Sequence, residues 1–268
     1  MLAPFEVLFD AGGPAYPLPP DLAALYGGLG FDEPVVYGNF VSSLDGVVTL
    51  GDKPSAGSIL SGRYPADRFL MGLLRACADA VLVGAGTLRA TPNHLWTPAH
   101  VFPDLAESFA ALRRELRRGP EPRLVVLTAS GSLDASHPAL VAGATVMTTS
   151  NGARRIARTL PACDVVEVGE GKALDVSAVV DVLAGRGWRC LLTEGGPHVI
   201  GELIQARRLD EVFLTLSPVL AGRDGERRLG MVEGVQLLPS DGVWSRLQSV
   251  RRHGDFLFLR HRLNVNRL

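Results

Sequence analysis

Glu194 and the two glycines that follow it form the stretch of this sequence best suited to chemistry. They lie in LLTEGGPHVIGELI, residues 191–204, where an apolar run meets a carboxylate, two glycines and a proline. The pattern predicts a buried strand that ends at Glu194 and a helix that begins near Pro197, because proline suits the first helical turn. Gly195 and Gly196 would then present bare backbone N–H groups at a helix N-terminus, a site that favours anions and often phosphate.

Three other predicted strands also end in glycine or hydroxyl residues. These residues are Gly84, Ala85, Gly86 and Thr87 after one strand, Thr128 and Ser130 after a second, and Thr148 after a third. Ligands of open α/β sheets bind beyond the carboxyl ends of the strands, and such groups suit a nucleotide's phosphates and ribose. The GAGT turn lacks both the third glycine of the dinucleotide fingerprint and the Gly-Lys-Ser/Thr of a P-loop. Alone, it is equally well explained as a tight strand-to-helix turn.

Asn39 and Asp67 are further candidates for a site. Asn39 lies in an apolar predicted strand, VVYGNFVSS, where a buried amide must find partners, so it either braces the sheet or contacts a ligand. Asp67 lies in the first turn of a helix predicted over 65–78, where a negative charge is also favourable without any catalytic role. The SSLDG segment after the strand, 42–46, is typical of a turn.

The order of elements predicts the fold class. Apolar strands alternate with amphipathic helices from Val35 onward, including a charged helix at roughly 104–118. This alternation favours a mostly parallel sheet with helices on both faces. The last strands follow one another without a helix, so we expect an antiparallel edge at the C-terminal side. We expect one domain over 35–268, with a Pro/Gly-rich arm over 1–34 packed on it.

Composition excludes several classes of function. The net charge of -1 gives no electrostatic basis for binding nucleic acid or an anionic membrane. No apolar run is long enough to span a membrane, and the N-terminus lacks the basic start of a signal peptide, so we expect a cytoplasmic protein. No metal motif is present. Two sets of residues are expected to be structural: the cysteines Cys77, Cys163 and Cys190 as buried thiols, and the loop histidines His94, His100 and His137 as non-catalytic groups.

Four motifs, in this order, resemble the reductase domain of the riboflavin pathway, which many bacteria fuse to a pyrimidine deaminase. The motifs are NFVSSLDG at 39–46, DRFLMGLLRACADAVLVGAGTLR at 67–89, RLVVLTASGSLD at 123–134, and LLTEGGPHVIGELIQARRLDEVFLTLSPVLAG at 191–222. The likeness covers roughly 35–262 and is greatest to stand-alone actinobacterial members that lack the deaminase. It implies a dihydrofolate-reductase-like, three-layer αβα fold, with a mostly parallel central sheet and an antiparallel C-terminal edge. It also implies a homodimer that uses NADPH.

The resemblance assigns roles to the strand ends. Gly195 and Gly196 would hold the cofactor pyrophosphate, helped by the turn from Gly84 to Thr87. Thr128 and Ser130 would lie near the adenosine and its 2′-phosphate, and Thr148 would line the adenine side. Family members often carry a basic residue where this chain has Ala129. That difference weakens the preference for NADPH over NADH, because a 2′-phosphate favours Arg or Lys.

The resemblance also implies a reaction, the reduction of a C=N bond in 5-amino-6-(5-phosphoribosylamino)uracil to give the ribitylamino form. A positioned carboxyl group or a relayed water would supply the proton. The catalytic candidates are Asp67, Glu194 and Asn39, and the candidates for substrate binding are Asn39, Ser42, Asp67, Arg89 and Thr91. Of these, Asp67 would hold a pyrimidine or pterin ring. The cations available for a substrate phosphate are Arg63, Lys53 and Arg89.

Two alternatives stay open at this point. Thr91 stands where the family usually has an aspartate thought to contact the sugar, so the substrate could instead be dihydrofolate, another pterin or a specialised metabolite with a C=N bond. The second alternative is a protein that binds NADPH without turnover, as a sensor or a partner subunit. The glycine turns of the cofactor site are intact, which argues against it.

Overall fold

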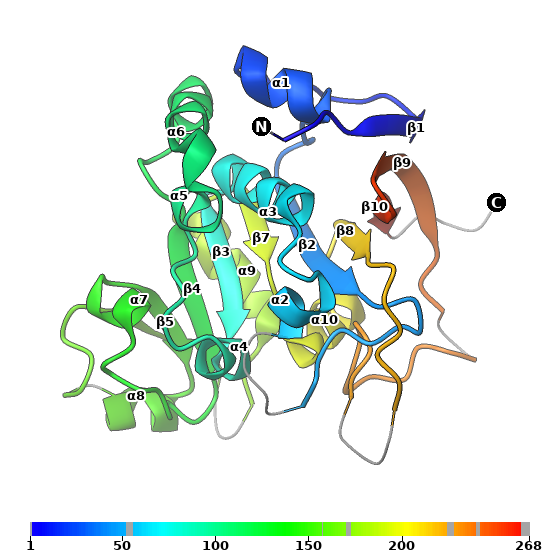
Figure 1. Ribbon diagram of the computed structural model, residues 1–268. Coiled ribbons are helices and arrows are strands. Elements are labelled where there is room, and N and C mark those ends of the chain that lie inside the picture. The colour runs from blue at the N-terminus through cyan, green and yellow to red at the C-terminus, as the bar shows by residue number, and fades with distance from the viewer. Residues whose placement is uncertain are drawn as a thin grey trace.

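A ten-stranded sheet runs through the whole molecule (Figure 1). The computed structural model describes residues 2–51, 56–156, 158–169, 173–223, 228–239 and 242–263. The strands are β1 (Glu6–Asp10), β2 (Val35–Ser42), β3 (Ala80–Gly84), β4 (Arg123–Thr128), β5 (Thr145–Thr148), β6 (Asp164–Glu167), β7 (Cys190–Thr193), β8 (Glu211–Leu216), β9 (Ser245–His253) and β10 (Phe256–Leu263). Their spatial order is β1-β9-β10-β8-β2-β7-β3-β4-β5-β6.

The sheet is parallel from β8 to β6 and antiparallel at its other edge. Strands β8, β2, β7, β3, β4, β5 and β6 pair in parallel, and β8, β10, β9 and β1 pair antiparallel. The prediction of a mostly parallel sheet with an antiparallel C-terminal edge is therefore confirmed. Sequence reasoning did not predict that β1, from the N-terminal arm, extends this edge by pairing with β9.

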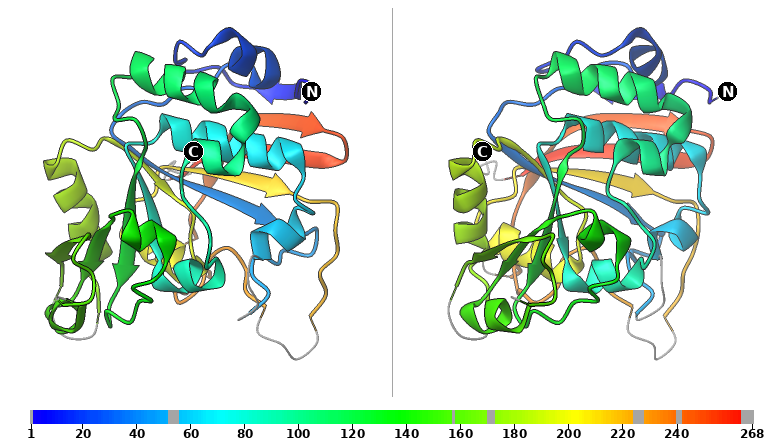
Figure 2. Two further views of the ribbon diagram at one scale, coloured as in Figure 1. Left: turned by 60° about the vertical axis from the view of Figure 1, so that its left-hand side comes forward. Right: turned by 90° about the vertical axis from the view of Figure 1, so that its left-hand side faces the viewer.

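Helices cover both faces of the sheet (Figure 2). They are α1 (Pro20–Tyr26), α2 (Ala56–Leu60), α3 (Pro65–Cys77), α4 (Ala85–Ala90), α5 (Pro98–Val101), α6 (Ala106–Glu115), α7 (Pro138–Val141), α8 (Ser150–Ile156), α9 (Val176–Gly185) and α10 (Pro197–Gln205), with a 3-10 turn η1 at Pro103–Leu105. One core cluster joins α1, α3 and α6 to the sheet, and a second joins α9 and α10 to the opposite face. Along β2, Val35 and Tyr37 enter the first cluster and Val36 enters the second, which is the period-two alternation of a strand buried on both sides.

Helix α3 carries the residues that matter most for the site. Pro65 is its first residue and Asp67 lies in its first turn, as the sequence predicts. The helix runs antiparallel to β3, which follows it in the chain, so its N-terminal end lies at the carboxyl ends of the parallel strands. The charged helix predicted at roughly 104–118 is shorter, α6 at Ala106–Glu115, and is preceded by the turn η1.

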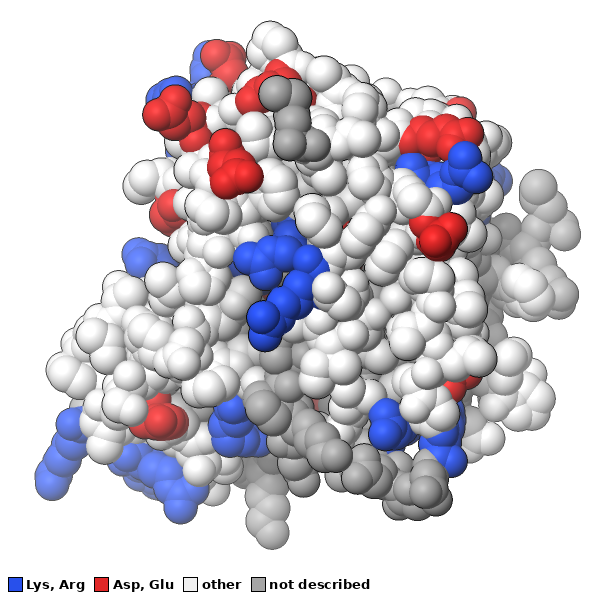
Figure 3. Space-filling model, in the orientation of Figure 1, with Lys and Arg blue, Asp and Glu red and all other residues white. Residues whose placement is uncertain are grey.

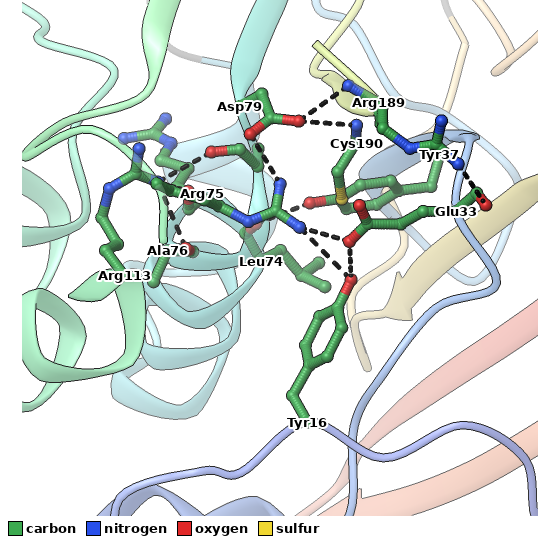
Figure 4. A network of polar contacts seen from close by, with 12 residues as sticks. Tyr16, Glu33, Tyr37, Leu74, Arg75, Ala76, Asp79, Arg113, Arg189 and Cys190 are labelled. Carbon is green, nitrogen blue, oxygen red and sulfur yellow. Dashed lines mark hydrogen bonds and ion pairs between the residues drawn. The ribbon is translucent and has the colours of Figure 1, made fainter. Parts of the chain in front are cut away.

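A polar network ties the N-terminal arm to the amino ends of the parallel strands (Figure 4). The Tyr16 hydroxyl donates to the Glu33 carboxylate, which also pairs with Arg118. Arg118 bonds Asp79 at 3.0 Å, and Asp79 in turn accepts from the backbone N–H groups of residues 189 and 190 at 2.8 and 2.9 Å. The arm is thus joined to β2, β3 and β7 at their amino ends, whereas the glycine turns lie at the carboxyl ends.

The three cysteines are free thiols. Cys77 and Cys190 are fully buried, and burial raises the pKa of both, to about 12 for Cys190. Cys163 differs from the expectation of a buried thiol, because it is only half-buried, with its sulfur 3.4 Å from the carbonyl oxygen of Leu140. Within the described residues, no group of side chains is arranged to hold a metal ion, and no helix has the length and apolar character to cross a membrane.

Candidate active site

A cavity of about 770 Å³ opens at the carboxyl ends of β2, β3 and β7. Its remaining walls are one face of α3, the helices α2, α4 and α5, the loop that leads from α4 to α5, the first turn of α10, and the segments around residues 48–51 and 229. It brings together these predicted site residues: Asn39, Asp67, Gly84, Gly86, Thr87, Arg89, Thr91, Glu194 and Gly196. Segments more than 150 residues apart in the chain, from Asn39 to Gly196, therefore meet in one space.

The two glycine turns form one end of the cavity. The N–H of Gly84 donates to the carbonyl oxygen of Gly195 at 2.8 Å, and the peptide bond between Gly195 and Gly196 is cis. Gly195 has φ +97°, and a Cβ there would lie 3.2 Å from the Phe40 ring. Gly196 precedes α10, and no side chain in the described part of the chain caps this helix. Its N-terminal amides can therefore receive an anion.

The hydroxyls after β4 and β5 lie outside the cavity. The Thr128 hydroxyl accepts from the N–H of Gly131 at 3.1 Å, and Thr148 is completely buried with no partner for its hydroxyl among the described residues. Ser130 is exposed, and its hydroxyl accepts from the N–H of Ser132 at 3.2 Å. The role of these residues near an adenosine stays a prediction.

Three other predicted residues are also absent from the cavity lining: Ser42, Ala85 and Gly195. Ser42 is buried, and its hydroxyl donates to the carbonyl oxygen of Ser43 at 2.8 Å. The SSLDG segment forms the turn that its sequence also allowed, closed by bonds from the N–H of Gly46 to the carbonyl oxygen of Ser43 at 3.0 Å and from the N–H of Val47 to the Ser43 hydroxyl at 2.9 Å. Ala85 begins α4 beside the lining glycines without lining the cavity itself.

Asp67 is a buried carboxyl group, only 5% exposed, in the cavity wall. Burial raises the pKa of Asp67 to about 6, opposed by the hydroxyls of Thr215 and Ser61, and the charge of Glu194 raises it further. The carboxyl group therefore changes between its protonated and charged forms near pH 6, closer to neutral pH than an ordinary aspartate, as functional carboxyl groups often do.

Glu194 lies in an entirely different electrostatic setting. Arg75, on α3, donates from Nε to Oε1 of Glu194 at 2.8 Å and from Nη2 to Oε2 at 2.6 Å. This bidentate geometry is the strongest form of a carboxylate–guanidinium pair. Because both Glu194 oxygens accept from Arg75, this carboxylate is held in one orientation and is suited to a structural role in the cavity. Among the described residues Asp67 has no such partner fixed on it, and its raised pKa makes it the carboxyl group better suited to bind a ligand.

Sequence reasoning missed Arg75. It lies eight residues after Asp67, with Met71 midway, so all three side chains project from one face of α3 into the cavity. The available signal was an arginine on the apolar face of a helix, which is uncommon unless the charge is paired. Its partner is 119 residues further along the chain.

The loop between α4 and α5 supplies an aromatic wall. Its cavity-lining residues are Thr91, His94 and Trp96, and His100 of α5 lines the cavity beside them. The His94 ring lies 5.0 Å from Trp96 and 4.8 Å from His100, both edge-on. Thr91 uses its hydroxyl locally, donating to the carbonyl oxygen of Thr87 at 2.8 Å. His137 lies outside the cavity; its ring accepts from the N–H of Ala139 at the start of α7.

Basic residues surround the mouth of the cavity. Arg63 and Arg89 are exposed and Arg68 is partly exposed, and all three line it. A space-filling view of this side of the molecule shows basic side chains gathered near the centre of the face (Figure 3). Lys53, the third cation that the sequence offered, lies outside the described residues.

Comparison with known proteins places the chain in a family. Residues 34–254 match the RibD C-terminal domain. The chain is 26% identical over 233 residues to the 2,5-diamino-6-ribosylamino-4(3H)-pyrimidinone 5′-phosphate reductase of Archaeoglobus fulgidus, an alignment that covers 87% of this chain and 99% of that protein. Since the family match covers more than half of the sequence, it identifies the family.

Solved structures of similar fold agree with this match. A pyrimidine reductase-like protein of Corynebacterium diphtheriae superposes with a TM-score of 0.71 at 20% identity, over 91% of this chain and 99% of that one. The riboflavin biosynthesis reductase Rib7 of Saccharomyces cerevisiae superposes with a TM-score of 0.56 at 16% identity, over 87% and 90%. At these identities the likeness establishes the shared fold.

Proposed function

The chain belongs to the RibD C-terminal domain family, and from that premise we propose that it is an NADPH-dependent reductase of a C=N bond. Its proposed substrate is 5-amino-6-(5-phosphoribosylamino)uracil or a close pyrimidine, and its product is the ribitylamino form. The observation that carries the proposal is that one cavity joins an uncapped, glycine-lined helix N-terminus to the buried carboxyl group of Asp67. The Archaeoglobus relative, named as a reductase of a ribosylamino-pyrimidinone phosphate, supports it.

The glycine turns fit a dinucleotide cofactor. Gly84, Gly86 and Gly196 line the cavity without side chains, and a Cβ on Gly86 would meet nothing within 4 Å, so the space beside it is open. The backbone amides of α10 would receive the pyrophosphate, helped by the helix dipole. When bound, the nicotinamide supplies the hydride that reduces the carbon of the imine.

Asp67 would hold the substrate ring. Above pH 6 its carboxyl group is charged and can accept hydrogen bonds from N–H donors on a pyrimidine edge. Asn39, half-exposed in the cavity wall, can both donate and accept there. Together these groups would hold the imine carbon at reacting distance, which accounts for much of the rate enhancement in reactions of this type.

Glu194 would order the site and not supply the proton. Its two oxygens already accept from Arg75, so the guanidinium group holds this carboxylate in a fixed orientation. The proton would therefore reach the imine nitrogen from a water that Asp67 or Asn39 orients. Arg63, Arg68 and Arg89, at the mouth, would face the 5′-phosphate of the substrate.

The test is NADPH oxidation by the purified protein, followed by absorbance, with two comparisons. The phosphoribosylamino-uracil and dihydrofolate are compared as substrates by kcat/KM, and NADH is compared with NADPH. We expect preference for the pyrimidine and for NADPH. Preference for dihydrofolate would make Thr91 the mark of a changed substrate. Tight NADPH binding without oxidation by either substrate would indicate a non-catalytic binding protein.

We also propose that the enzyme is a cytoplasmic homodimer, as the family resemblance implies. Light scattering at micromolar concentration should then give twice the chain mass of 28.6 kDa. A monomer mass at that concentration would contradict the homodimer.

A further inference from the structure

Arg75 is buried to 1% exposure in the wall of the cavity. We propose that Arg75 is a positioning residue: it holds the Glu194 carboxylate and the loop from Thr91 to Val101 in one arrangement, and so sets how the substrate ring is held. The inference rests on the proposed reductase function and adds to it a residue that does not touch the reacting atoms.

Every donor of the Arg75 side chain is used. A guanidinium group has five N–H donors and no acceptor. Nε and one Nη2 hydrogen serve Glu194 at 2.8 and 2.6 Å, and the second Nη2 hydrogen serves Nε2 of His94 at 2.9 Å. Nη1 serves the carbonyl oxygens of Leu95 and Thr97, both at 3.3 Å. A charge this deeply buried is tolerated only when it is paired and hydrogen-bonded, and here each N–H has a partner.

These contacts join three separate elements of the chain. Arg75 lies on α3, Glu194 follows β7, and residues 94–97 belong to a loop between two short helices. The two carbonyl contacts bracket Trp96, which is 4% exposed and faces the cavity. Movement of Arg75 would therefore shift the carboxylate and the aromatic wall together.

The contact with His94 also selects a tautomer. Because the guanidinium can only donate, Nε2 of His94 must accept, and the ring proton must lie on Nδ1. Burial lowers the pKa of His94 to about 2, and Arg75 lowers it further, so the ring is neutral. His94 thus presents one defined donor beside His100 and Trp96.

Arg113 provides the matched control. It is also a buried arginine, 2% exposed, but within the described part of the chain it donates only to backbone carbonyls, those of Arg75, Ala76, Ala78 and Gly119, and it does not line the cavity. It has the burial of Arg75 without the contacts to Glu194 and the loop.

The kinetic test compares Arg75→Lys with Arg113→Lys. Lysine keeps the charge but cannot form the planar fork. For Arg75→Lys we expect kcat/KM for the preferred imine substrate to fall about a hundredfold, mostly in kcat, as orientation effects predict. For Arg113→Lys we expect a comparable loss of thermal stability with kcat and KM per folded enzyme unchanged. If both variants change only the folded fraction, or lose activity alike, the positioning role is refuted.

A second measurement does not depend on turnover or on a folded variant of Arg75. Nitrogen-15 NMR of the histidine side chains in the wild-type protein, assigned with His94→Asn, reports the tautomer directly. We expect the neutral ring with its proton on Nδ1; a ring protonated at Nε2 would overturn the inference even if the protein is an active reductase. Conversely, the expected tautomer in a protein that reduces no substrate would place the failure on the proposed function.

Discussion

The backbone N–H of Gly84 donates to the carbonyl oxygen of Gly195 at 2.8 Å. This bond joins the turn after β3 to the turn after β7, two neighbouring parallel strands whose turns lie 111 residues apart in the chain. It holds the turn before α10 against the turn after β3, so that Gly84 and Gly196 line the same end of the cavity beside the N-terminus of α10. The two weak sequence motifs thus form one end of the cavity, the end that we propose binds the cofactor pyrophosphate.

Gly195→Ala should weaken cofactor binding. The residue has φ +97°, which side-chain-bearing residues rarely adopt, and the new Cβ would press on Phe40 at 3.2 Å. Strain of this type costs on the order of 1–3 kcal/mol. If the turn rotates to relieve this strain, the amide of Gly196 is displaced. We therefore expect the Kd for NADPH to rise at least about tenfold. Fluorescence titration measures it.

Gly185→Ala is the control for that substitution. Gly185 ends α9, has no positive φ, and a Cβ there would meet nothing within 4 Å. We expect unchanged NADPH affinity and stability equal to or slightly above that of the wild type, since alanine favours helix over glycine. Equal affinities for the two alanine variants would show that the Gly195 turn is not part of the cofactor site.

The pH dependence of kcat/KM should report Asp67. Its pKa of about 6 means that it is protonated below that pH and charged above it. If the carboxylate holds the ring by accepting N–H bonds, kcat/KM falls about tenfold per pH unit below pH 6. Asp67→Asn should remove this limb and lower the plateau. Activity that instead rises as the pH falls through 6 would make Asp67 the proton donor.

The same substitution should stabilise the protein at high pH. Asp67 has its pKa raised from 3.8 to about 6 by burial, so the folded state loses stability as the pH rises through that interval. The difference corresponds to roughly 3 kcal/mol at most. We expect Asp67→Asn to be more stable than the wild type at pH 8 and equal to it near pH 4. Urea unfolding at both values measures the difference.

Asp45 offers a control of opposite sign. The Ser43 hydroxyl and the backbone amides of Ala221 and Gly222 hold the pKa of Asp45 down to about 2. Asp45→Asn should therefore lower stability at neutral pH, with the difference vanishing below pH 2. Stabilisation by both asparagine variants at pH 8 would point to net charge and not to the burial of Asp67.

Glu33→Gln should separate stability from activity. Arg118, whose side chain is 5% exposed, would lose one of its two charge partners at the amino ends of the strands and keep only Asp79. We expect a loss of about 2 kcal/mol in the free energy of unfolding. We expect kcat/KM to be unchanged, because the cavity lies at the carboxyl ends of the strands and this network lies at their amino ends. Glu6→Gln, at an ion pair with both side chains 54% exposed, should cost under about 1 kcal/mol. Equal losses would contradict the structural role of the network.

Local patterns predicted most of the fold. Pro65 and Asp67 mark the start of α3, and Gly195-Gly196-Pro197 marks the change from β7 to α10, because turn and cap chemistry depends on a few adjacent residues. The pairing of β1 with β9 was missed, since a five-residue strand with both faces exposed has no apolar alternation to reveal it.

The sequence by itself determined the strand-turn-helix units, the glycine turns, and the positions of Asn39 within a strand, Asp67 in the first turn of a helix and Glu194 at the end of a strand. The tertiary structure decided which of these residues share a cavity: it brought those three together and left Thr128 and Thr148 outside. It also paired Arg75 with Glu194, a contact between residues 119 positions apart. Burial and charge pairing between distant segments depend on how the layers pack, so no local pattern contains them.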